Sequence, residues 1–208
     1  AAYESYLKGI GFLQRYDKPG NLDMAIQLLN DAITRDPRFA LGFARLAEAE
    51  RLKYRESRAQ PVLDLAVTHA KHAVELDDQL APVHVTLGQI HSETGKYDLA
   101  VEEFQRALKL DPRNAEAYER TAGTFQAMGR FDEAEKNFKT AIALRPNDWS
   151  GHNALGAFYY NRGRYSEAAA QFRTVIDLTP DNATAYLNLG VMLGRLNDNA
   201  GARDAFQK

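Results

Sequence analysis

Histidines are the residues of this chain best suited to bind a metal or to transfer a proton. His69 and His72 stand three positions apart in a segment of helical periodicity, and this spacing puts two potential metal ligands on one face of a helix. Two histidines alone do not define a metal site, so we expect two solvent-facing side chains. His84, His91 and His152 occupy positions that equivalent segments fill mainly with Tyr or Phe. These three rings are therefore predicted to pack between helices.

Acidic pairs are the other candidates for catalysis. Glu102-Glu103, and Glu133 with Glu135, fall on the outward faces of predicted helices, and we interpret them as solvated surface and not as a general acid and base. The sequence has no Gly-rich phosphate loop, nucleophile elbow or HExxH string. It therefore predicts no catalytic, cofactor-binding or metal-binding residue, and a protein that is not an enzyme.

The elements that would position a binding residue follow a repeat of 34 residues, marked by Pro112, Pro146 and Pro180. A proline cannot continue a helix and ends each unit. Two further positions recur in step: a large ring at Phe104, Phe138, Phe172 and Phe206, and a turn residue at Gly95, Gly129, Gly163 and Asn197. Apolar residues at i, i+3, i+4 and i+7 between these markers predict two amphipathic helices in each repeat.

One repeat shows most of the pattern, which reads Leu155-Gly156, Tyr159, Ala168, Phe172 and Pro180, with His152 three residues before Leu155. This pattern resembles the tetratricopeptide repeat family, whose signature is W-x2-L-G-x2-Y…A-x3-F…P, over residues 81–208. The resemblance implies an all-α fold, a right-handed superhelical α-solenoid of antiparallel helix hairpins. Asn197 and Asn199 replace the usual glycine and aromatic residue, which predicts a looser turn in the last hairpin.

We interpret residues 1–208 as a single solenoid of six hairpins. The repeats are degenerate at 1–39 and 40–80, regular at 81–114, 115–148 and 149–182, and partial at 183–208. An insertion near 51–61 predicts a first helix extended by about two turns, followed by a connector. The chain starts without an initiator Met and stops inside a predicted helix, so we expect a piece of a larger protein. The first fifty residues resemble repeat regions of large bacterial signalling proteins that follow kinase or regulator domains.

Composition limits the partners. Lys and Arg number 26 against 28 Asp and Glu, and no basic block occurs, which disfavours nucleic acid. No apolar run reaches the roughly 18 residues of a membrane span, so no membrane insertion is predicted. The chain has no cysteine, which fits the cytoplasm or the periplasm; we leave the compartment open and favour the cytoplasm.

The resemblance also implies a binding face. In this family the first helix of each hairpin lines a concave groove. Of its inward positions carried over to this chain, those selected as candidate binding residues are Gln89, Arg120, Gln126, Asn153, Tyr160, Asn161, Asn188 and Arg195. Amides donate and accept hydrogen bonds, arginines grip carboxylates, and a tyrosine offers flat contact area. We therefore expect a protein–protein interaction module that binds a peptide segment or helix of a partner, without a cofactor.

The alternative is a structural spacer or self-association module within a larger multidomain protein, such as a kinase- or regulator-linked one. A stacked array normally ends with a helix whose outer face is polar, whereas this chain ends near Phe206. The uncapped C-terminal end is therefore the expected contact of a homo-oligomer, unless further repeats cover it.

Overall fold

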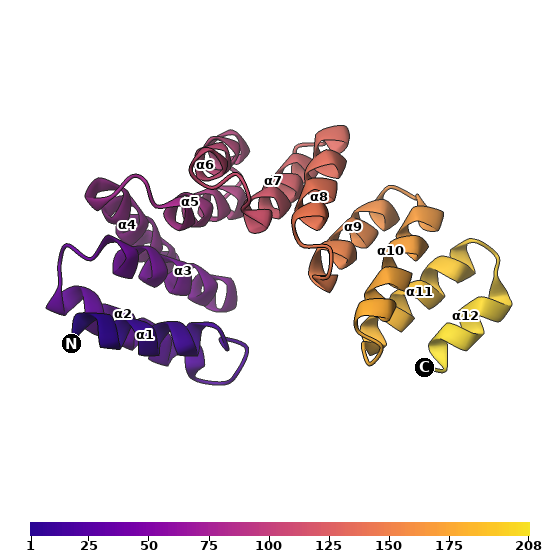
Figure 1. Cartoon of the computed structure of the whole chain (residues 1–208), viewed down its shortest axis with the longest axis horizontal. Helices are drawn as coiled ribbons and strands as arrows, with labels where there is room; N and C mark the ends of the chain where they lie inside the picture. Colours follow the sequence, from indigo (N-terminus) through magenta and orange to yellow (C-terminus); the bar gives the residue numbers. More distant parts are fainter. The chain divides into compact units, whose positions relative to one another are not determined.

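The computed structural model describes residues 1–208 and contains only α-helices, with no β-strand. It divides into two compact units, residues 1–112 (unit 1) and residues 113–208 (unit 2) (Figure 1). Unit 1 holds α1 (Ala2–Leu13), α2 (Asn21–Arg35), α3 (Ala40–Ser57), α4 (Gln60–Leu76), α5 (Ala81–Glu93) and α6 (Tyr97–Leu110). Unit 2 holds α7 (Ala115–Ala127), α8 (Phe131–Leu144), α9 (Trp149–Asn161), α10 (Tyr165–Leu178), α11 (Ala183–Arg195) and α12 (Asn199–Phe206). The predicted all-α class is confirmed.

Consecutive helices pack in pairs, and each pair is one helical hairpin. The approach is close where a glycine faces a phenylalanine ring. A Cβ atom added at Gly88 would lie 2.5 Å from the ring of Phe104, and one at Gly156 would lie 3.0 Å from the ring of Phe172. Phe104 is fully enclosed. The recurring glycine and phenylalanine of the sequence are thus the points at which the two helices of a hairpin touch.

Helices α7, α9 and α11 begin in the same way. The side-chain oxygens of Asn114 and Asn182 accept backbone N–H groups of the following first turn at 3.0 and 3.1 Å, and Asp148 does so at 3.0 Å. These N-caps satisfy donors that the start of a helix leaves unpaired. They place the start of each helix at the same point of the repeat, so that equivalent residues share equivalent faces.

The turns within the regular hairpins have one backbone geometry. Their glycines have φ between 70° and 75°, in the left-handed region that glycine adopts readily. Asn197 takes φ 63° at the equivalent position of the last hairpin. The N–H of Asp198 then donates to the carbonyl of Leu193 at 2.9 Å, the bond that also closes the other turns. The prediction of a looser last turn is therefore wrong, because asparagine tolerates this conformation.

The second hairpin, α3 with α4, is the irregular one. Helix α3 has 18 residues where α5 has 13, so the extension is about one and a half turns and not two. Its C-cap is Arg58, a non-glycine residue with φ 55°. Helix α4 then starts at Gln60, with a proline in its first turn, where a missing N–H costs nothing. The lengthened α3 packs against both α4 and α5.

Candidate partner-binding face

Seven of the eight predicted groove residues lie in unit 2, and all seven reach solvent. Arg120, Tyr160, Asn161 and Arg195 are exposed, while Gln126, Asn153 and Asn188 are half-buried. Residues on the packed faces of the same helices, such as Thr121, Leu155 and Leu189, are buried in their hairpins. Helices α7, α9 and α11 make no extensive contact with one another, so these faces are not closed by a neighbouring first helix. We call this set of seven residues the amide face.

The four amides of this face have no hydrogen-bond partner within the protein. No hydrogen bond joins the side chains of Gln126, Asn153, Asn161 or Asn188 to another group, whereas the cap residues of the same helices are engaged. An amide carries two donors and an acceptor with two lone pairs. This capacity is open to a molecule that approaches the face.

The charged and aromatic members of the amide face are only loosely engaged. Arg120 lies 3.4 Å from Glu116 on its own helix, with both side chains nearly half exposed, and such a pair contributes little stability. Arg195 forms no ion pair. Tyr160 is 38% exposed and its ring lies 6.1 Å from that of Tyr165. These side chains are therefore free to reorient toward a ligand at small cost.

One carboxylate borders the amide face without a partner. Glu119 is half-buried on α7 and lines a narrow recess of about 10 Å³ together with Arg145, Asp148 and Gly151. Burial raises the pKa of the Glu119 carboxyl, and Arg120 opposes this rise. The recess is too small for a ligand, so Glu119 contributes negative character to the α7 end of the face.

The opposite end of the amide face is apolar. Leu187 is 55% exposed and Val191 is 36% exposed on α11, at positions equivalent to Asn153 and Ala157 on α9. Exposed aliphatic side chains beside unpaired amides suit a ligand that has both a backbone and apolar side chains. The amide face thus changes from acidic at α7 to apolar at α11.

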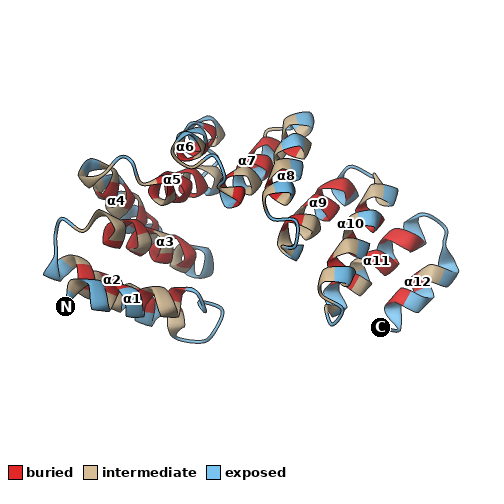
Figure 2. Cartoon of the chain, viewed as in Figure 1, coloured by how far each residue is buried: buried red, intermediate tan, exposed pale blue.

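Gln89, the eighth predicted residue, is not on an open surface. It lies on α5 in unit 1 and is 6% exposed, and Val85 and Thr86 at the neighbouring groove positions are buried as well. Figure 2 shows that α5 is buried along most of its length. The cause is α3, which packs against α5 and whose Arg51 donates to Glu93 at 2.6 Å. Gln89 is therefore removed from the candidate site.

Two histidines, His84 and His69, make structural contacts, only one of them in the predicted way. His84 is buried, with Nδ1 at 2.7 Å from Glu103 and Nε2 at 3.0 Å from the carbonyl of Asp78. His69 was expected to face solvent, yet its side chain is 18% exposed and pairs with Glu50, itself buried, at 2.8 Å. No group of three or more His, Cys, Asp or Glu residues is arranged to hold a metal ion.

Two of the acidic residues predicted as solvated surface make partly buried contacts instead. Glu103 binds His84, as described above, and Glu135 accepts hydrogen bonds from Arg164 and Tyr159 of the next hairpin. Burial opposes the charge on Glu135, but hydrogen bonds from Arg164, Lys139 and Tyr159 outweigh it and lower its pKa to about 2. The pairing joins consecutive hairpins of unit 2, which a single-helix pattern cannot reveal.

A pocket in unit 1, lined by α4, α5 and the turn that follows α5, was missed altogether by the sequence reasoning. The only sequence signal for it is the insertion near 51–61, which lengthens α3 and precedes α4.

None of the helices combines the length and the apolar composition that a membrane span needs.

Comparison with known proteins identifies the repeats. Tetratricopeptide repeat models match residues 79–147, 122–183 and 159–208, and no curated protein matches the chain. Among solved structures, the chain is similar to a thermophilic TPR protein of Thermus thermophilus, with 22% identity, 93% of this chain and 99% of that chain covered, and a TM-score of 0.77. It is also similar to pilF of Pseudomonas aeruginosa, with 21% identity, 98% and 88% covered, and a TM-score of 0.76.

A third similar structure is YrrB, described as a TPR protein with an unusual peptide-binding site. The identity is 21%, 85% of this chain and 88% of that chain are covered, and the TM-score is 0.59. At these identities the likeness shows the fold, an α-solenoid of helical hairpins. The family models together span residues 79–208, more than half of the sequence. The chain belongs to the tetratricopeptide repeat family.

Proposed function

We propose that this chain is a non-enzymatic interaction module that binds an extended peptide segment of a partner protein on the amide face of unit 2. The observation that carries the proposal is the set of four amides without partners on α7, α9 and α11. Repeat proteins of this kind use extended surfaces to bind other proteins. The chemistry available here is hydrogen bonding and apolar contact, and no group is poised for a reaction.

The amides favour an extended ligand. Asn153 and Asn188 come from successive hairpins, so a chain running along the unit meets one amide after another. The backbone N–H and C=O groups of an extended peptide have no hydrogen-bond partners within the peptide. An amide side chain can accept from the N–H groups and donate to the C=O groups. A helical ligand satisfies its own backbone groups and would leave these amides unused.

The ends of the amide face set the direction and side chains of the ligand. Arg195 on α11 has no ion pair and attracts a carboxylate, which an arginine holds in a fork. Leu187 and Val191 beside it contact apolar side chains. Glu119 and Glu116 at the α7 end favour a basic residue. We therefore expect a peptide with an acidic and apolar part over α11 and a basic part over α7.

The test is partner capture from a lysate of the source cells, read by mass spectrometry. The native chain is compared with an Asn153→Ala, Asn188→Ala, Arg195→Glu variant whose helical circular dichroism is intact. A matched control carries Arg173→Glu and Asn147→Ala, two exposed positions of unit 2 outside the amide face.

The proposal requires a partner that binds the native chain and the control but is lost from the triple variant. A partner retained by all three proteins would place the binding surface elsewhere and refute the proposal. Loss from both variants would show that the substitutions act through charge or folding and not through the amide face.

A second candidate function, self-association, rests on a different observation. Phe206 is 54% exposed and Leu196 is 43% exposed in the last hairpin, whose helix α11 also carries the exposed Leu187. Clustered exposed apolar side chains often mark a contact. Sedimentation measured over a wide concentration range tests this candidate. Oligomers that disappear on Leu196→Gln and Phe206→Gln, and persist in the amide-face variant, would favour self-association over peptide binding.

A further inference from the structure

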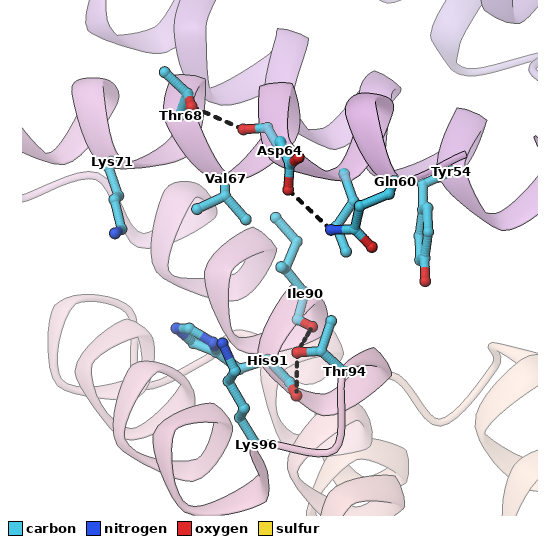
Figure 3. A pocket seen from close by; sticks show the side chains of 11 residues that line it. Tyr54, Gln60, Asp64, Val67, Thr68, Lys71, Ile90, His91, Thr94 and Lys96 are labelled. Carbon is cyan, nitrogen blue, oxygen red and sulfur yellow. Dashed lines mark hydrogen bonds between the residues drawn. The ribbon is translucent and has the colours of Figure 1, made fainter. Parts of the chain in front are cut away.

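Unit 1 contains an open pocket of about 460 Å³. Its walls are α4, the C-terminal end of α5 and the turn before α6, and Tyr54 at the end of α3 borders it (Figure 3). The extra length of the second hairpin creates it, because Tyr54 and Gln60 lie within the insertion near 51–61. The pocket belongs wholly to unit 1 and shares no residue with the amide face.

Three basic side chains converge on one part of this pocket. Lys71 extends from α4, while His91 and Lys96 face it from α5 and the following turn (Figure 3). The side chain of neither lysine forms an ion pair or a hydrogen bond within the protein. Burial lowers the pKa of His91, the charges of Lys96 and Lys71 lower it further, and Glu103 of α6 opposes the shift. The surroundings of His91 are thus electropositive and hold no counter-charge within ion-pair distance.

The floor of the pocket is apolar. Leu63 and Ile90 are buried, and the partly buried Val67 and Tyr54 pack against them. The one carboxylate of the lining, Asp64, accepts a hydrogen bond from Gln60 at 2.9 Å. A ligand therefore meets an aliphatic surface flanked on one side by positive charge.

From this combination we infer that the pocket binds a peptide segment in which a carboxylate side chain adjoins an aliphatic one. The aliphatic side chain lies on Val67 and Ile90, and the carboxylate lies among Lys71, Lys96 and His91. The site goes beyond the peptide binding proposed for unit 2, because other residues, in the other unit, form it.

A phosphate group fits the pocket less well. Arginine side chains, which hold phosphate in a bidentate fork, are absent from the lining of the pocket. Asp64 in the lining repels a phosphate dianion more strongly than the single negative charge of a carboxylate. A free phosphate has no apolar surface to bury against the floor of the pocket, whereas an aliphatic peptide side chain gains stability from that contact.

The test uses blocked tripeptides and nuclear magnetic resonance of the full chain labelled with 15N and 13C. The probe is acetyl-Leu-Glu-Leu-amide, and its matched control is acetyl-Leu-Gln-Leu-amide, which keeps the shape and removes the charge. Each is added to about 10 mM, ten times a millimolar Kd. Inorganic phosphate is titrated separately, and the ring signal of His91 is followed against pH.

We expect the Glu peptide to shift signals of Val67, Ile90, His91 and Lys96, and to raise the pH at which the His91 ring titrates. The Gln peptide should bind about five- to tenfold more weakly, since it loses several exposed charge pairs. A Lys71→Glu, Lys96→Glu variant, altered only at two exposed side chains, should lose the preference for the Glu peptide.

Three results would overturn the inference: no shift of pocket signals at the highest concentration, equal binding of the two peptides, or phosphate shifting the lysine signals more strongly than the Glu peptide. Because the readout is confined to signals of unit 1, failure here leaves the amide face untouched. Failure of the capture experiment on unit 2 likewise leaves this pocket untouched.

Discussion

Adding one methyl group at two equivalent glycines should have opposite effects on stability. A Cβ atom at Gly88 would lie 2.5 Å from the ring of Phe104, and one at Gly190 would lie 2.4 Å from the ring of Phe206. The two clashes are nearly the same size, but the rings differ. Phe104 is fully buried, whereas Phe206 is 54% exposed and can rotate into solvent.

The magnitudes follow from two opposing terms. Replacing a helical glycine by alanine stabilises the helix by about 0.5–1 kcal/mol. Forcing an enclosed ring to move costs about 1–3 kcal/mol. Gly88→Ala should therefore lower the free energy of unfolding by about 1–2 kcal/mol. Gly190→Ala keeps the helix gain without the packing cost and should be neutral or up to about 1 kcal/mol more stable.

Urea unfolding followed by circular dichroism measures the two changes, and hydrogen exchange assigns them to α5 and α11 separately. A double-mutant cycle adds Phe104→Leu, which should cost less in the Gly88→Ala background than in the native one. Equal effects of the two alanines, or an additive cycle, would refute the argument that burial of the facing ring decides the outcome.

Other predictions concern unit 2. Glu135→Gln should destabilise the chain at neutral pH by at most about 1–2 kcal/mol, because the partly exposed pair is screened. Since the folded pKa of Glu135 is about 2 and its ordinary value is near 4.3, this contribution is present above about pH 4.5 and is lost as pH falls toward 2. Urea titrations from pH 7 to pH 3 would contradict this if the difference stayed constant. Phe138→Ala should cost about 3–5 kcal/mol, and Arg120→Ala should leave the melting temperature nearly unchanged; a thermal melt checks both.

Local structure was readable from the sequence because each repeat specifies it internally. The 34-residue spacing located the turns, and the pairs of Gly88 with Phe104 and Gly156 with Phe172 located the contacts within hairpins. The N-caps and the turns fix where each helix begins and ends. They therefore also fix which side of α9 carries Asn153 and which side of α11 carries Asn188, because an α-helix has 3.6 residues per turn. The division into repeats and the single continuous solenoid stay predictions.

Polar contacts between helices could not be read in the same way. Glu103 and Glu135 looked like solvent-facing residues on their own helices, yet His84 and Arg164 of other helices pair with them. A pattern within one helix says which residues are polar, but it does not say what the next element places opposite them. A polar residue at such a contact becomes part of a pair because leaving it buried alone is costly.

The sequence by itself determined the helical hairpins and the family, because short-range periodicity and turn chemistry act within one repeat. Only the tertiary structure decided which faces stay open. The same register that exposes Asn153 on α9 buries Gln89 on α5, since the lengthened α3 packs across α5 and Arg51 reaches Glu93. The same lengthening produces the pocket beside His91. Both outcomes depend on where a neighbouring helix lies. The insertion near 51–61 indicates that the second hairpin differs from the others, but it does not specify how its helices pack.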